Sequence, residues 1–187
     1  YFAQLAMQVG PRALIDAVSV FGIDIARTPA ALRDTLPHAG YGQGHVLTSP
    51  LDMARVAAAI AAGGHAVPVR WTADEIAPAD EPPFLAEADA KRLARYMREV
   101  VTSGTGRALA GNATPIAGKT GTAEVDGRPA HSWFVGMAPY GGRRPIAFAV
   151  IVEHAGYGGR TAAPIAGAIV DAARELGLFD TTTKASR

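Results

Sequence analysis

Residues 116–125, Ile116-Ala117-Gly118-Lys119-Thr120-Gly121-Thr122-Ala123-Glu124-Val125, predict a β-strand, and the residues that follow predict the rest of a sheet. Asp126-Gly127, directly after this strand, is a strong signal for a hairpin turn. Residues 133–137, Trp-Phe-Val-Gly-Met, predict a second strand, and the apolar run Ile146–Val152 predicts a third. Connections this short favour three neighbouring antiparallel strands. Because Ile146–Val152 is apolar on both alternating faces, we expect it to be central and covered on both sides.

Helical patterns surround the three strands. A Ser-Pro start with Asp52 in the first turn predicts a helix from about residue 49, and residues 87–101 are amphipathic. Residues 1–9 predict the end of a helix, Gly10-Pro11 restarts it, and Gly22 closes it. Residues 23–46 show no clear periodicity, and residues 65–84 are Pro-rich. A last helix, residues 161–176, has Ile165, Ile169, Val170, Ala173 and Leu176 as its expected inward face. The order predicts an α+β fold, an antiparallel sheet sandwiched by helices.

The composition excludes several classes of protein. The chain has 187 residues, 49% of them hydrophobic, with a formal net charge of +1, which is too apolar for intrinsic disorder. It contains no Cys, so disulfide frameworks, thiolate zinc sites and cysteine nucleophiles are excluded. No apolar run approaches the roughly 18 residues of a membrane span. The near-neutral charge argues against nucleic acid as a partner. The start, Tyr1-Phe2-Ala3-Gln4, is neither a signal peptide nor an initiator Met, so we expect a piece of a longer protein.

The segment Gly118-Lys119-Thr120-Gly121-Thr122 carries the strongest chemical signal. A lysine flanked by two hydroxyl groups can hold an anion, because the ammonium supplies charge and the threonines supply directed donors. Gly118 and Gly121 leave the strand bare, which suits the close approach of an extended ligand as an added strand. Lys-Thr-Gly is also one part of the motif set of serine acyl-enzymes. Taken alone, the tripeptide is equally compatible with a solvent-facing strand lysine.

The neighbouring blocks add to this motif. Residues 100–106 read Val-Val-Thr-Ser-Gly-Thr-Gly, and residues 131–139 read His-Ser-Trp-Phe-Val-Gly-Met-Ala-Pro. Further upstream, residues 42–54 read Gly-Gln-Gly-His-Val-Leu-Thr-Ser-Pro-Leu-Asp-Met-Ala. With these blocks in this order, the chain resembles the transpeptidase domain of penicillin-binding proteins, especially the monofunctional, class B-like type. The resemblance covers roughly residues 1–177, within an expected domain of residues 1–180 that a polar tail, residues 181–187, follows.

The resemblance implies a β-lactamase/transpeptidase-like fold and a D,D-transpeptidase of peptidoglycan synthesis that β-lactam antibiotics also acylate. By this resemblance, Lys119, Thr120 and Thr122 would bind the carboxylate of the stem peptide or of a β-lactam. The backbone N–H of Thr122 would be one of two oxyanion donors, and Gly121 would let the substrate backbone lie against the strand. No cofactor or metal is implied. Other cell-wall synthesis proteins are possible partners, and the implied location is extracytoplasmic, with any membrane anchor outside this chain.

Two motifs of the family are missing. Its Ser-x-x-Lys supplies the nucleophile and the lysine that activates it, and its Ser/Tyr-x-Asn helps to move protons. No serine here has a lysine three residues later, and the only asparagine, Asn112, follows Ala110 by two residues. We therefore expect both motifs to precede Tyr1 in the whole protein, and we expect these 187 residues alone to be inactive.

Two other functions fit the same motifs. A serine β-lactamase shares the Lys-Thr-Gly and Trp-Phe-Val-Gly strands, and a non-catalytic domain, either one that senses β-lactams or a degenerate scaffold, would keep the fold without the reaction. The histidines are scattered without metal-ligand spacing. His131 is better explained by a structural hydrogen bond than by catalysis. Glu124 and Asp126 are best explained as solvated hairpin carboxylates.

Overall fold

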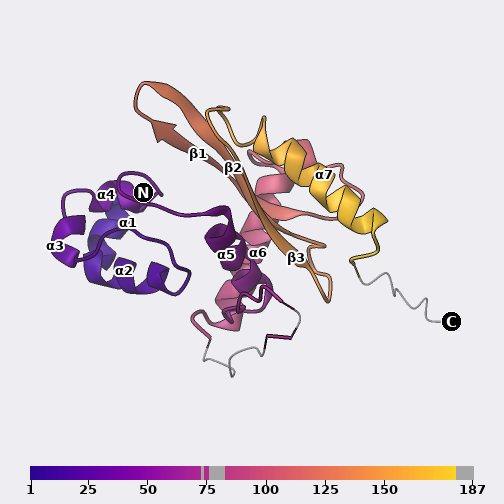
Figure 1. Ribbon diagram of the computed structural model, residues 1–187, viewed down its shortest axis with the longest axis horizontal. Coiled ribbons are helices and arrows are strands. Elements are labelled where there is room, and N and C mark those ends of the chain that lie inside the picture. Colours follow the sequence, from indigo (N-terminus) through magenta and orange to yellow (C-terminus); the bar gives the residue numbers. More distant parts are fainter. Residues whose placement is uncertain (73, 76–82, 180–187) are drawn as a thin grey trace.

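The computed structural model describes residues 1–72, 74–75 and 83–179 (Figure 1). Four helices come first, α1 (Phe2–Val9), α2 (Pro11–Ser19), α3 (Pro29–Leu32) and α4 (Leu36–Ala39). Two longer helices follow, α5 (Pro50–Ala61) and α6 (Glu87–Thr102), and then a short 3-10 turn, η1 (Arg107–Leu109). The sheet strands are β1 (Ala117–Val125), β2 (Arg128–Ala138) and β3 (Ile146–Val152), and α7 (Ala162–Glu175) ends the series. The predicted α+β architecture is confirmed.

The three strands form an antiparallel sheet in the order β1-β2-β3. Gly118 lies opposite Gly136, and Thr122 lies opposite Ser132, with an irregularity in the pairing between Ala123 and Val125. The central strand of the described sheet is therefore β2, and the prediction that Ile146–Val152 is central was wrong. The prediction that this strand is covered on both sides is confirmed, because β3 contacts α5 on one face of the sheet and α7 on the other. The second strand also begins earlier than predicted, at Arg128, since its polar first residues continue the hairpin ladder without a hydrophobic signal.

Helices cover both faces of the sheet (Figure 1). On one side lie α5, which contacts β2 and β3, and α6, which contacts β1, while α7 crosses the other side against β2 and β3. The main core joins strand residues such as Phe134 to the small residues of α7. Small side chains let α7 lie close to the sheet, so its buried face is Ala162, Ala163, Ala166, Gly167, Val170 and Ala173. The expected inward positions Ile165, Ile169 and Leu176 are exposed instead.

Helices α1–α4 form a separate group with a small core of their own, built on Ala6, Ile25, Leu32 and Leu36. The segment predicted to be irregular, residues 23–46, thus contains two single-turn helices, which are too short to show a helical period. The preceding helix ends at Ser19, and Gly22 lies in the turn beyond it with φ of +78°. Arg55 of α5 donates to the carbonyl oxygens of Phe21 and Val20, and so ties this group to the rest of the chain.

Local signals located the two longer helices well. Ser49 caps α5 in a capping box, with its side chain accepting from the Asp52 N–H and the Asp52 carboxylate accepting from the Ser49 N–H. In α6, the predicted inward residue Leu93 is 40% exposed, whereas Arg98 turns inward and donates to the Ile116 carbonyl oxygen at 2.7 Å. None of the helices in the described part of the chain has the length and hydropathy that crossing a membrane requires. The predicted tail, residues 181–187, lies outside the described residues.

Candidate active site

The open edge of β1 brings together two of the polar side chains around the Lys-Thr-Gly motif. Lys119 Nζ donates to the carbonyl oxygen of Thr120 at 2.6 Å. Gln43 Nε2, from the turn after α4, donates to the carbonyl oxygen of Thr122 at 3.1 Å. Since β2 pairs with the opposite edge of β1, these carbonyl groups face away from the sheet. A lysine ammonium and a side-chain amide therefore lie along the same free edge.

The orientation of Thr122 follows from strand geometry. In an antiparallel ladder, a residue directs its N–H and its C=O to the same side, and successive residues alternate between the partner strand and the open edge. Because the Thr122 carbonyl meets Gln43 at the open edge, its N–H faces the same edge. Thr122 is also exposed, unlike its neighbour Thr120. The backbone of Thr122 therefore presents a hydrogen-bond donor at the same edge of β1 where the Lys119 ammonium binds the Thr120 carbonyl oxygen.

The edge favours ligands that accept hydrogen bonds. The outward carbonyl groups of Thr120 and Thr122 each already accept one hydrogen bond from a side chain. An incoming group meets an ammonium, the outward N–H of Thr122 and its exposed hydroxyl. Carboxylates and the oxyanion of a tetrahedral intermediate are groups of this type.

Thr120 occupies a different position from the other predicted site residues. It is 8% exposed, and its hydroxyl lies 2.6 Å from the hydroxyl of Thr105, in the loop after α6. A ligand carboxylate would have to compete with Thr105 to reach it. The motif therefore divides into an exposed pair, Lys119 and Thr122, and a buried threonine that joins β1 to the preceding loop.

The protein's own groups use the space left by the motif glycines. A side chain at Gly118 would meet the Phe134 ring, and one at Gly121 would meet Trp133 Cβ at 2.9 Å. Gly158, in the loop before α7, lies against the backbone of Gly121 and Trp133. These glycines allow close packing around the strand, whereas the sequence suggested only room for a ligand.

His131 has the structural role that the sequence favoured. Its Nδ1 accepts a hydrogen bond of 3.0 Å from the backbone N–H of His154. The His154 ring lies 4.6 Å away and approaches the Pro129 carbonyl oxygen at 3.0 Å. The two rings thus fasten the end of β3 to the start of β2.

Gln43 and Thr105 are functional candidates that the residue-level reasoning missed. Both lie in blocks that carry the family resemblance, each next to glycines, but neither was given a role. Their contacts join residues 79 and 15 positions apart, which no local pattern reports. The sequence did offer one signal for both residues: each is a polar residue between two glycines, inside a block that carries the family resemblance.

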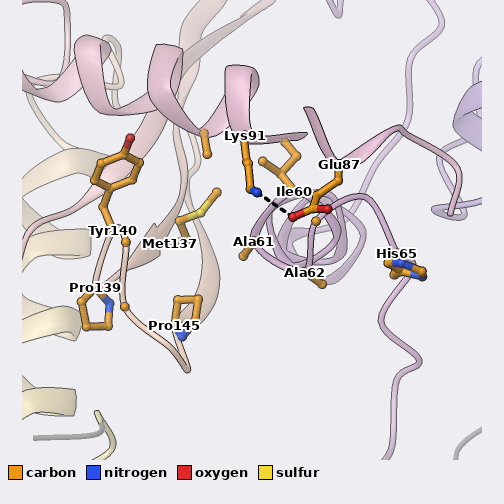
Figure 2. A pocket seen from close by; sticks show the side chains of 14 residues that line it. Ile60, Ala61, Ala62, His65, Glu87, Lys91, Met137, Pro139, Tyr140 and Pro145 are labelled. Atoms are coloured by element: carbon orange, nitrogen blue, oxygen red, sulfur yellow. Dashed lines mark ion pairs between the residues drawn. The ribbon is translucent and has the colours of Figure 1, made fainter. Parts of the chain in front are cut away.

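A cavity of about 500 Å³ lies elsewhere, between the end of α5, the start of α6 and the turn after β2 (Figure 2). An ion pair between Glu87 and Lys91 crosses one side of it, and Tyr140 and His65 also line it. None of the residues at the open edge of β1 contributes to this cavity. Across residues 1–72, 74–75 and 83–179, no cluster of His, Asp or Glu side chains has the arrangement of a metal site.

Comparisons with known proteins agree with this architecture. The sequence model described as "Penicillin binding protein transpeptidase domain" matches residues 1–171. The D,D-transpeptidase domain of a peptidoglycan glycosyltransferase from Eggerthella lenta superposes with a TM-score of 0.75 at 27% identity, covering 95% of this chain and 51% of that one. Penicillin-binding protein 2 of Pseudomonas aeruginosa, in complex with WCK 5153, gives 0.74 at 30% identity, covering 92% and 44%.

A third similar structure is penicillin-binding protein A of M. tuberculosis, solved as a ceftriaxone acyl-enzyme complex, with a TM-score of 0.70, 28% identity and coverage of 92% and 45%. No protein in the curated set matches the chain. The chain spans about half the length of these three solved structures. The family match over residues 1–171 and the shared fold lead to one conclusion: the chain belongs to the penicillin-binding protein transpeptidase domain family.

Proposed function

We propose that this chain is part of a serine D,D-transpeptidase that crosslinks peptidoglycan stem peptides and is acylated by β-lactams. The observation that carries the proposal is the open edge of β1, which the outward N–H of Thr122 faces and where the Lys119 ammonium binds the carbonyl oxygen of Thr120. Lys119 and the Thr122 hydroxyl bind the ligand carboxylate. The buried Thr120 supports this part of β1 through its contact with Thr105, and the backbone at Gly121 lies along the ligand.

The Thr122 N–H has a separate task in this proposal. A serine oxygen attacks the carbonyl carbon of the donor peptide, and the carbonyl oxygen becomes an oxyanion that the Thr122 N–H stabilises. Collapse forms the ester, breaks the amide C–N bond and releases the terminal amino acid, whose amine takes a proton. The amine of a second stem peptide then attacks the ester, forms the crosslink and returns the serine. With a β-lactam, the ring amide opens and the leaving nitrogen stays attached.

The nucleophile is proposed to lie on a part of the domain that these 187 residues do not span. No serine here has a lysine three residues later. The printed description of the M. tuberculosis relative records an acyl-enzyme, which supports covalent chemistry in this family. Since peptidoglycan is built outside the cytoplasmic membrane, the proposal includes an extracytoplasmic location.

The test is covalent labelling of the full-length protein with a fluorescent penicillin, followed by gel fluorescence and intact mass. We expect a stable adduct, and Lys119→Ala should lower labelling at limiting penicillin by about 10- to 100-fold, because a charge-assisted contact is lost. Lys91→Ala is the matched control, since this exposed lysine pairs with Glu87 away from β1. Unchanged labelling of the Lys119 variant would remove that residue from the site.

The same experiment separates the alternatives. A β-lactamase would release hydrolysed penicillin with turnover, and its adduct would be short-lived. A non-catalytic domain of the same fold would give no covalent adduct in the full-length protein. Either outcome would contradict the proposed transpeptidase.

A further inference from the structure

Gln43 is held in an unusually defined position for a loop residue. It lies between Gly42 and Gly44, which have φ of +81° and +76°, the left-handed region that glycine adopts without strain. Its own backbone N–H donates to the His38 carbonyl oxygen at 3.0 Å and so closes the turn against α4. The side chain is half-buried and reaches from this turn to β1.

The contact falls where β1 loses its regular pairing. Thr122 lies opposite Ser132 in register, but the ladder becomes irregular between Ala123 and Val125. An edge strand has a partner on one side only, so its backbone has less restraint there, and a bulge weakens it further. The hydrogen bond from Gln43 to the Thr122 carbonyl fastens the strand at this point. In the described structure, it is the hydrogen bond that joins residues 1–47 to the sheet.

Holding the Thr122 carbonyl also orients the Thr122 N–H. The two groups flank one Cα and face the same side of an extended residue, so restraining one limits rotation of the other. We propose that Gln43 is a positioning residue that acts through the Thr122 carbonyl and keeps the Thr122 N–H aimed at the reacting carbonyl oxygen. This inference rests on the proposed function, and it deepens that function by coupling helices α1–α4 to the oxyanion donor.

A positioning role for Gln43 predicts that loss of its hydrogen bond changes the acylation rate constant but not the initial dissociation constant. In the proposed function the side chains of Lys119 and Thr122 bind the ligand carboxylate, whereas the Gln43 hydrogen bond goes to the Thr122 backbone carbonyl, so the initial dissociation constant should change little. Stabilisation of the oxyanion depends on the N–H direction, so the acylation rate constant at saturating ligand should fall. A misaligned donor loses about the worth of one hydrogen bond, which corresponds to about a five- to tenfold slower acylation.

The experiment measures both constants in the full-length protein with a fluorescent penicillin. Gln43→Met keeps the side-chain length and removes the donor, and Gln43→Lys restores a donor and should recover most of the acylation rate constant. Gln8→Met, on the exposed surface of α1, is the matched control. Hydrogen–deuterium exchange without ligand provides a second readout, because β1 around Thr122 should exchange faster in Gln43→Met.

The outcomes are distinct. A lower acylation rate constant with an unchanged dissociation constant, together with faster exchange at Thr122, supports the positioning role. An unchanged acylation rate constant in Gln43→Met contradicts that role while the proposed function stands. A change in the dissociation constant alone contradicts it too, since Gln43 would then contact the ligand directly. Absence of any adduct in the unmodified protein overturns both the proposed function and the role that rests on it.

Discussion

The hydroxyl of Ser132, fully buried in β2, accepts a hydrogen bond of 3.0 Å from the backbone N–H of Ala162, the first residue of α7. The first N–H groups of a helix have no partner within the helix, so this serine satisfies one of them from the sheet. Ser132→Ala leaves that N–H buried and unpaired, and we expect a loss of about 1–3 kcal/mol in the free energy of unfolding. Urea unfolding of the protein measures it. Ser19→Ala, whose exposed hydroxyl bonds within the last turn of α2, should cost less than about 0.5 kcal/mol.

The hydroxyl pair of Thr105 and Thr120 predicts an asymmetric result. Thr120 is buried and Thr105 is exposed, so only Thr105 can exchange its partner for water. Thr105→Val should therefore destabilise the protein by about 1 kcal/mol, because the Thr120 hydroxyl loses its partner. Thr120→Val removes the buried hydroxyl that Thr105→Val leaves without a partner. The double variant should therefore recover most of the stability that Thr105→Val loses. A double-mutant cycle in urea tests this coupling, and strictly additive effects would argue against it.

Close packing of Gly158 against the motif strand makes this glycine sensitive to any side chain. The Cβ of an alanine there would collide with backbone atoms of Gly121 and Trp133, which cannot move aside as a side chain can. Gly158→Ala should lower the melting temperature and reduce the free energy of unfolding by about 1–3 kcal/mol. It should also slow penicillin labelling, because the displaced Gly121 lies between Thr120 and Thr122. Gly111→Ala is the control, since its Cβ would meet nothing within 4 Å.

The Glu87–Lys91 ion pair on α6 predicts a weak acid dependence. The Lys91 ammonium donates to the Glu87 carboxylate and attracts it, and so lowers the pKa of Glu87 below its ordinary 4.5. Because folding lowers this pKa, the stabilisation is fully present above pH 4.5 and is lost as the pH falls through the lower folded pKa. Glu87→Gln should therefore flatten stability against pH in this acid range. The effect should be small and should shrink with salt, since both side chains are exposed; an acid urea-unfolding series at two salt concentrations measures it.

Much of the secondary structure could be predicted from the sequence, because its signals are local. The Asp126-Gly127 turn, the Ser-Pro helix start with Asp52 in its first turn, and the strand predicted over residues 116–125 each depend on neighbouring residues, and the structure has a hairpin, a helix start and a strand there. Single-turn helices such as α3 escaped prediction, since four residues do not show a period. The bounds of β2 were also missed, because the pairing of its polar start depends on the partner strand.

The candidate site, too, could be predicted from the sequence only where its residues are neighbours in the chain. Lys119, Thr120, Gly121 and Thr122 stand out in the sequence because they are adjacent, and the surrounding blocks were sufficient to indicate the family that the comparisons show. Only the tertiary structure decided which of these groups face the open edge, that Thr120 is buried against Thr105, and that Gln43 reaches Thr122 from 79 residues away. Composition and periodicity report what a residue and its neighbours prefer. The approach of distant segments depends on how helices and strands pack, and that geometry is set by the whole core.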